Sequence, residues 1–272
     1  MFPQQGDSLG MNIGDMNLLY SLSGFAVGMI VGLTGVGGGS LMTPLLVLVF
    51  GIHPATAVGT DLLYAAATKS VGTLVHRRAN SVNWQIVGRL ASGSVPATAV
   101  TFLVMHAMGV LSSKGGVLAV MLGVVLLMTS ATLVFRNQIV AYLGSRIAPG
   151  NDRQVAVLTV LTGVIMGVLV TTTSVGAGAI GVTALLILYP RLPILRIIGS
   201  DIAHAVPLTL IAGLGHWWLG DVDFGLLFTL LIGSIPGIVV GSLLAPKLPE
   251  QVLRLMLAGV LVLVSLKLIG VF

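Results

Sequence analysis

The sequence predicts an all-α, polytopic transmembrane protein, organised as two inverted repeats of five membrane segments each, and three observations lead to this fold class. First, 56% of the 272 residues are hydrophobic and only 8% are charged, whereas soluble domains carry about 25% charged residues. Second, the hydrophobic residues form long apolar runs without the period-2 alternation of a membrane β-barrel. Third, the two halves of the chain share short motifs at several spaced positions.

The apolar runs define the domain organisation. A polar N-terminus at 1–17 is expected in the periplasm, and a cytoplasmic linker at 136–154 separates the first repeat, 18–135, from the second repeat, 155–272. Residues 1–17 contain no Lys or Arg, so a cleaved signal peptide is not expected. The membrane segments are expected at 18–34, 40–50, 55–76, 84–106 and 117–135, and again at 155–171, 179–189, 194–215, 224–244 and 251–271.

Short motifs recur in the two halves at a constant offset of 140 residues. Gly59-Thr60-Asp61 is repeated as Gly199-Ser200-Asp201, and Gly93-Ser94-Val95-Pro96 is repeated as Gly233-Ser234-Ile235-Pro236. A glycine-rich break near the start of each half recurs at an offset of 139. Agreement at several spaced positions is typical of an internal duplication, so the architecture should be duplicated as well.

The loop charges predict how the repeats are oriented. Five is an odd number of segments, so the second repeat should enter the membrane from the opposite side. Arg77 and Arg78 lie in a first-half loop, whereas the corresponding loop of the second half carries Asp221 and Asp223. Because positively charged loops stay in the cytoplasm, both termini are expected on the periplasmic side of a bacterial inner membrane.

Each repeat is expected to open with a glycine-broken helix pair. The breaks are Thr34 to Ser40 and Thr171 to Gly178, and each glycine costs about 1 kcal/mol relative to alanine inside a helix. The segment after each break has 11 residues, roughly 16 Å of helix against a hydrocarbon core of about 30 Å. We interpret each pair as a re-entrant hairpin; two full crossings would give the same topology.

The breaks also predict a binding site. Non-helical backbone at this depth is tolerated where it lines a cavity, and the N-termini of the short helices attract anions. The alternative is that these small residues only permit close helix packing. The substrate-binding residues are expected to be Thr34, Gly35, Gly37, Gly38, Gly39, Ser40, Lys69, Thr173, Ser174, Gly176 and Gly178.

Four charged or titratable residues inside the apolar segments are candidates for function. Lys69 is expected well inside its helix, where ionisable groups mark a substrate or ion pathway; alternatively, its long side chain reaches the headgroups. Asp61, Asp201 and His204 are candidates for proton coupling. The alternative for the aspartates is hydrogen bonding to the broken hairpins, and His204 alone could be a core histidine.

Two prolines, Pro96 and Pro236, occupy matching mid-helix positions after Gly-Ser. Proline kinks a helix, so both are candidate gating hinges, and tolerated packing kinks are the alternative.

Other functional classes find no support. The chain has no cysteine, no metal-ligand spacing and no catalytic triad or phosphate loop, so neither enzyme activity nor a metal or other cofactor is expected. The net charge of +5 comes from basic residues in short loops, which act as topology signals and not as a nucleic-acid surface. The expected partners are a small anion and the lipid bilayer, and a homodimer is left open.

Four motifs carry a family resemblance: Gly28-xxx-Gly32-xx-Gly35-x-Gly37-Gly38-Gly39-xxxx-Pro44, Ala57-Val58-Gly59-Thr60, His76-Arg77-Arg78-xxx-Val82-Asn83-Trp84 and Gly93-Ser94-Val95-Pro96. They resemble the sulfite exporter TauE/SafE family of membrane permeases. The resemblance implies a secondary transporter for sulfite, organosulfonates or related small sulfur-containing anions, working by alternating access with or without proton coupling. Many members have a small residue after Gly-Thr, where this chain has Asp61 and, in the second half, Asp201. The alternative function is a channel for small anions or neutral solutes.

Overall fold

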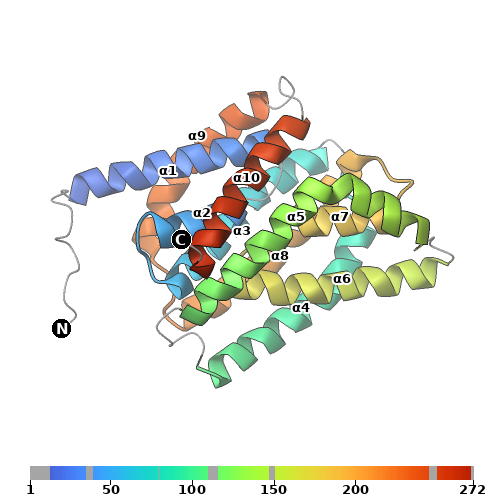
Figure 1. Ribbon diagram of the computed structural model, residues 1–272, viewed down its shortest axis with the longest axis horizontal. Helices are drawn as coiled ribbons and strands as arrows, with labels where there is room; N and C mark the ends of the chain where they lie inside the picture. The colour runs from blue at the N-terminus through green and yellow to red at the C-terminus, as the bar shows by residue number, and fades with distance from the viewer. Residues whose placement is uncertain are drawn as a thin grey trace.

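The computed structural model describes residues 13–34, 39–78, 80–109, 116–146, 151–244 and 250–270. The regular secondary structure in these ranges is entirely helical, which confirms the predicted all-α class (Figure 1). The helices are α1 (Ile13–Thr34), α2 (Gly39–Leu48), α3 (Pro54–Arg78), α4 (Trp84–Ala107), α5 (Gly116–Arg146), α6 (Asp152–Thr173), α7 (Ala179–Leu188), α8 (Ile194–Trp218), α9 (Phe224–Leu244) and α10 (Glu250–Ile269).

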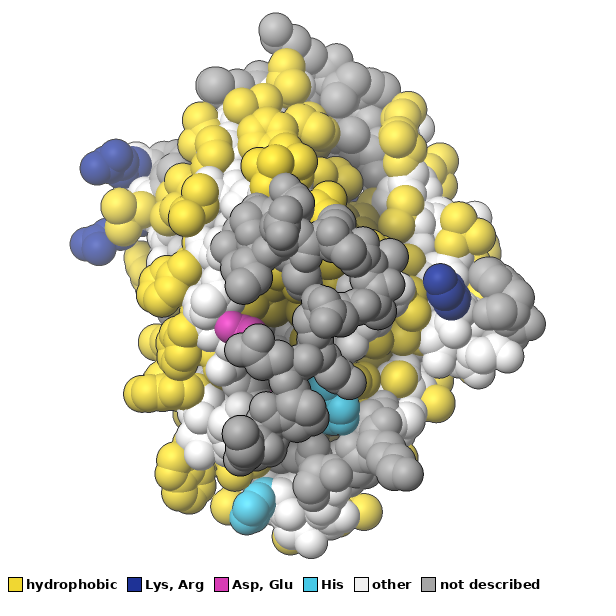
Figure 2. Space-filling view, turned by 90° about the vertical axis from the view of Figure 1, so that its left-hand side faces the viewer, with side chains coloured by type: hydrophobic (Ala, Val, Ile, Leu, Met, Phe, Trp, Pro, Cys, Tyr) yellow, Lys and Arg dark blue, Asp and Glu magenta, His cyan; other side chains and the backbone are white. Residues whose placement is uncertain are grey.

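The outer surface is that of a membrane protein. Helices α4, α5, α6, α8 and α9 contain stretches long and apolar enough to cross a bilayer. Large apolar side chains point outward from them, for example Leu103 of α4 and Ile232 of α9, which are 63% and 71% exposed. Figure 2 shows hydrophobic side chains over much of one face, with Lys and Arg at its margins. Such an exterior is stable in lipid and would aggregate in water.

Each short helix folds back beside the helix that precedes it. The ring of Tyr20 in α1 packs against Phe50, just beyond α2, with the ring centroids 4.6 Å apart. In the second half, the Thr159 hydroxyl of α6 is hydrogen-bonded to the Tyr189 hydroxyl, just beyond α7, at 2.8 Å. These contacts join positions that correspond at an offset of 139. Both helix pairs therefore return toward the end from which they start.

Helices of the first half pack against helices of the second half. Helix α9 lies along α1, α4 lies along α6, and α3 packs on α8 in the middle (Figure 1). A Cβ on Gly233 of α9 would overlap the carbonyl oxygen of Ser21, and a Cβ on Gly93 of α4 would overlap that of Val160. Only glycine permits such backbone contact. Gly93 and Gly233 correspond at an offset of 140, so the same residue makes the same kind of contact in each half.

Matching hydrogen bonds join the halves next to the central helices. The backbone N–H of Asn83 donates to the hydroxyl of Ser200 at 2.8 Å, and the N–H of Asp223 donates to the hydroxyl of Thr60 at 3.1 Å. Both donors and both acceptors correspond at an offset of 140. Each hydroxyl directly precedes a buried aspartate, so these bonds help to position α3 and α8.

Some helix boundaries differ from the expected ones. Helix α5 continues beyond 135 to Arg146, so much of the expected linker at 136–154 is helical, and α1 begins at Ile13 within the expected polar N-terminus. A fall in hydropathy does not end a helix. The last turn of α5 is also favourable, because Arg146 lies 4.5 Å from the centroid of the Tyr142 ring and a cation suits a helix C-terminus.

Candidate functional site

Four ionisable side chains lie together in the interior, on α3 and α8. Asp61 and Lys69 belong to α3, Asp201 and His204 belong to α8, and none is more than 9% exposed. Lys69 interacts electrostatically with the other three, and apolar side chains of α3, α6 and α8 form a buried core on and beside the same two helices. Burying charge in an apolar core is costly, so such a group indicates function. We call these four residues the central cluster.

Asp61 connects α3 to both hairpins. The hydroxyl of Thr43, on α2, donates to Asp61 Oδ2 at 2.5 Å. Ser174, which follows α6 in a left-handed conformation with φ 59°, places its side chain beside the same carboxyl group. Asp61 is therefore held by the first hairpin and faces the break of the second.

Asp201 lies at the N-terminus of α7. The backbone N–H of Gly178, the residue that precedes the helix, is next to its carboxyl group. A Cβ on Gly181, in the first turn, would overlap Asp201 Oδ1, so the absence of a side chain there makes room for the carboxylate. The positive end of a helix dipole stabilises a negative charge in this position. Both aspartates therefore contact the broken hairpins, which was the alternative to proton coupling considered from the sequence.

Lys69 is buried and has no ion pair with any residue that the structure describes. It feels the charges of Asp201 and Asp61, but within the described ranges no carboxylate oxygen lies within ion-pairing distance of its Nζ. The central cluster carries one positive and two negative charges when the lysine and both aspartates are ionised and His204 is neutral. An unpaired buried ammonium is expensive, and an anion beside it would supply the missing partner.

Several buried polar atoms of this region have no hydrogen-bond partner among the described residues. They are Oδ1 of Asp61, Oδ1 of Asp201, Oγ of Ser174 and Nδ1 of His204. Leaving such atoms unpaired costs about 1–3 kcal/mol each, and native structures rarely accept that cost without water or a ligand. The central cluster is therefore a candidate binding site.

The structure describes only some of the predicted binding residues. Thr173, Ser174, Gly176 and Gly178 lie at the buried break between α6 and α7, where the Thr173 hydroxyl is engaged by backbone groups of Leu169 and Val175. Gly35, Gly37 and Gly38 lie outside the described residues, as do the side chains of Thr34 and Ser40; Gly39 is the first residue of α2.

The predicted hinges lie beside polar contacts that the sequence did not reveal. Helices α4 and α9 continue through Pro96 and Pro236. Two residues before Pro96, the Ser94 hydroxyl is hydrogen-bonded to His204 Nε2 at 2.8 Å. At the corresponding place in the other half, Ser234 faces the hydroxyl of Tyr64. The recurring Gly-Ser-x-Pro motif could have indicated these contacts, but only its proline was considered from the sequence.

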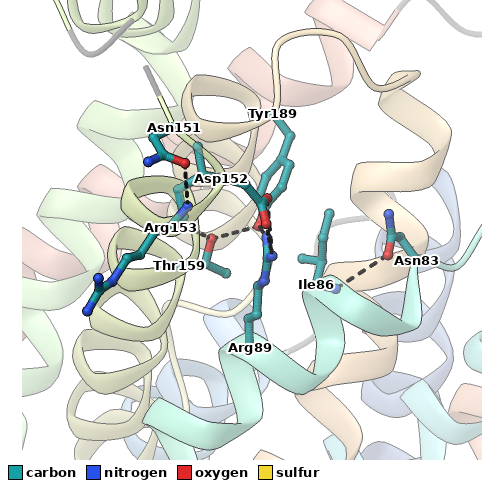
Figure 3. Close-up of polar contacts among 9 residues, drawn as sticks. Asn83, Ile86, Arg89, Asn151, Asp152, Arg153, Thr159 and Tyr189 are labelled. Carbon is teal, nitrogen blue, oxygen red and sulfur yellow. Dashed lines mark hydrogen bonds and ion pairs between the residues drawn. The ribbon is translucent and has the colours of Figure 1, made fainter. Parts of the chain in front are cut away.

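A second polar group, also missed, joins α4 to the second hairpin (Figure 3). Arg89 of α4 forms an ion pair with Asp152 at 3.0 Å and donates to the Tyr189 hydroxyl at 3.2 Å. Tyr189 in turn bonds Thr159, so the group links the start of α6 to the end of α7. An arginine in the second turn of an apolar segment was the available signal.

Comparison with known proteins identifies the family. The chain matches the sulfite exporter TauE/SafE family over residues 20–268. It belongs to this family. The TauE/SafE chain is 36% identical over 260 residues to the probable membrane transporter protein YjnA of Bacillus subtilis, covering 93% of the chain and 100% of the relative. It is 28% identical to YdhB, a second probable membrane transporter of that bacterium, over 87% of the chain and 94% of the relative. No solved structure matches.

Membership has direct consequences for this TauE/SafE protein. It is a multi-pass membrane transporter and not an enzyme, as the sequence predicts. A probable membrane transporter of Xylella fastidiosa, 29% identical over 83% of each chain, agrees with this class. Within the described ranges, His, Cys, Asp and Glu side chains form no group of three that could hold a metal ion.

Proposed function

We propose that this protein is a secondary transporter that moves sulfite, an organosulfonate or a related small sulfur-containing anion across the inner membrane by alternating access. The observation that carries the proposal is Lys69, a buried ammonium that interacts with two matched aspartates without pairing with either in the described part of the chain. A bound anion would complete a charge-assisted hydrogen bond there.

The donors near the central cluster suit an anion with several oxygens around one sulfur. Lys69 has three N–H donors, the start of α7 presents backbone N–H groups, and the Ser174 hydroxyl lies beside the Asp61 carboxyl group. These donors come from α3 and from the break of the second hairpin. A ligand held between them would touch both halves of the protein.

Alternating access follows from the proposed inverted repeats. The matched contacts of Gly93 and Gly233, and of Thr60 and Ser200, support a relation in which each half uses the same residues against the other. If the halves exchange their conformations, the site opens to the other side of the membrane. Pro96 and Pro236 are the proposed hinges, next to the serines that face α8 and α3.

Counterflow in proteoliposomes tests this function. Vesicles loaded with unlabelled sulfite are diluted into a trace of radiolabelled sulfite, and the same is done with methanesulfonate. A carrier exchanges the two pools, so label should accumulate transiently above its outside concentration. Equilibration without accumulation would identify a channel, and no uptake of either anion would contradict the proposed substrate class.

A further inference from the structure

The N-terminus of α7 is an anion position that the protein itself fills. Helix α7 has ten residues, starts from buried backbone, and no side chain of its own segment caps it; Gly178 precedes it with φ 113°. The first N–H groups of a helix lack intrahelical partners and carry a partial positive charge. The carboxyl group of Asp201 lies there, beside the Gly178 N–H and in the space left by Gly181.

Only part of the Asp201 carboxyl group is held in this position. Its Oδ1 atom has no hydrogen-bond partner among the described residues, although the side chain is only 2% exposed. Lys69 senses its charge from beyond ion-pairing distance. Buried polar atoms normally have a hydrogen-bond partner, so an Oδ1 without one among the described residues is able to accept a proton.

The charges around Asp201 do not allow a second anion to join it. Lys69 and Asp61 face the region from α3, His204 lies one turn further along α8, and the Tyr64 hydroxyl is directed toward α9. The described residues of α4, α6 and α7 that touch the cluster, such as Ser94, Met166 and Gly181, are uncharged. With both aspartates ionised, Lys69 protonated and His204 neutral, the sum is already −1. An incoming anion needs either a new positive charge or the loss of a negative one.

We infer that Asp201 is a tethered competitor of the transported anion. Its carboxylate occupies the N-terminus of α7 when substrate is absent, and the anion takes that place when the Asp201 carboxylate accepts a proton and swings away. One proton then moves with each anion, and nothing is oxidised or reduced. This inference rests on the proposed function, because it assigns the coupling step to the same site.

Methanesulfonate is the probe, because it is the anion of a strong acid and carries no proton of its own. In proteoliposomes, uptake of radiolabelled methanesulfonate is measured alongside the internal acidification that a trapped pH indicator reports. For the unmodified protein, one proton should enter with each anion. The half-saturating concentration should rise about tenfold per pH unit once Asp201 is ionised, because one bound proton is linked to each bound anion.

Asp201→Asn supplies the decisive variant, since the amide imitates the protonated acid. The anion that this variant still takes up should enter without a proton, and the pH dependence of affinity should be lost. Asp223→Asn is the matched control: this aspartate is exposed, and asparagine can replace it as the residue that accepts the Leu226 N–H at the start of α9. The control should keep both the proton signal and the tenfold dependence.

The outcomes separate the two proposals. If Asp201→Asn still carries a proton with each anion, or if the unmodified protein shows no pH dependence, the inference is wrong and the proposed function stands. If the unmodified protein exchanges neither sulfite nor methanesulfonate, the proposed function itself fails. If the variant does not fold, the unmodified protein still tests the inference. Its half-saturating concentration must rise with pH, and one proton must enter with each anion.

Discussion

Replacing Lys69 with methionine tests whether the buried ammonium binds the substrate. Methionine keeps most of the length of the side chain and removes its charge, so a role in packing alone would leave transport nearly unchanged. A charge-assisted hydrogen bond contributes about 1.5–3 kcal/mol, which corresponds to a roughly ten- to hundredfold loss of anion affinity. The loss should fall in the upper part of that range, because the variant leaves Asp61 and Asp201 without a nearby cation.

Affinity is measured as the concentration of unlabelled anion that halves counterflow. Lys267→Met is the matched control, because Lys267 is exposed in the last turn of α10 and has no role in the site. Lys69→Arg should recover only part of the affinity, since a planar guanidinium differs in shape from a compact ammonium. Unchanged affinity in Lys69→Met would refute the reasoning and leave the site to the hairpin backbone alone.

Two further predictions concern packing and topology. Gly233→Ala should destabilise the protein by about 1–3 kcal/mol in thermal unfolding in detergent, because α9 must move away from α1. Gly88→Ala is its control, since a Cβ there meets nothing within 4 Å and alanine favours the helix. Cysteines placed singly at Arg78 and Trp218, exposed matching positions in α3 and α8 of this cysteine-free chain, should react with an impermeant thiol reagent from opposite faces. Labelling from the same face would contradict the inverted repeats.

Much of the fold could be predicted because it depends on hydropathy and on repetition. The short helices α2 and α7 lie within one or two residues of the expected segments, since glycine breaks and proline punctuate the chain. The extension of α5 to Arg146 could not be read from hydropathy, because a polar stretch can remain helical. Which helices pack together was also not foreseen: α1 on α9 and α4 on α6 depend on glycines whose role appears only when both partners are known.

The charged residues of the candidate site could be predicted from the sequence, but the residues that contact them could not. Lys69, Asp61 and Asp201 stand out because ionisable residues are rare inside apolar segments. Their partners are small and uncharged, and Ser94, which contacts His204, was marked only by the recurring Gly-Ser-x-Pro motif. Only the fold brings together positions that are 110 residues apart.

The two aspartates occupy matching places in the sequence, yet the neighbouring short helices differ. In α2 the Thr43 hydroxyl holds Asp61; at the corresponding place in α7, at the offset of 139, stands Val182, which has no hydrogen-bond donor in its side chain. The buried Met42 likewise corresponds to Gly181, which leaves room for Asp201. A hydroxyl donor holds a carboxylate in place, whereas a glycine only gives it space. The two acids therefore have different partners: Asp61 accepts from the Thr43 hydroxyl, whereas Asp201 lies beside the Gly178 N–H at the N-terminus of α7, the position that we infer an incoming anion takes.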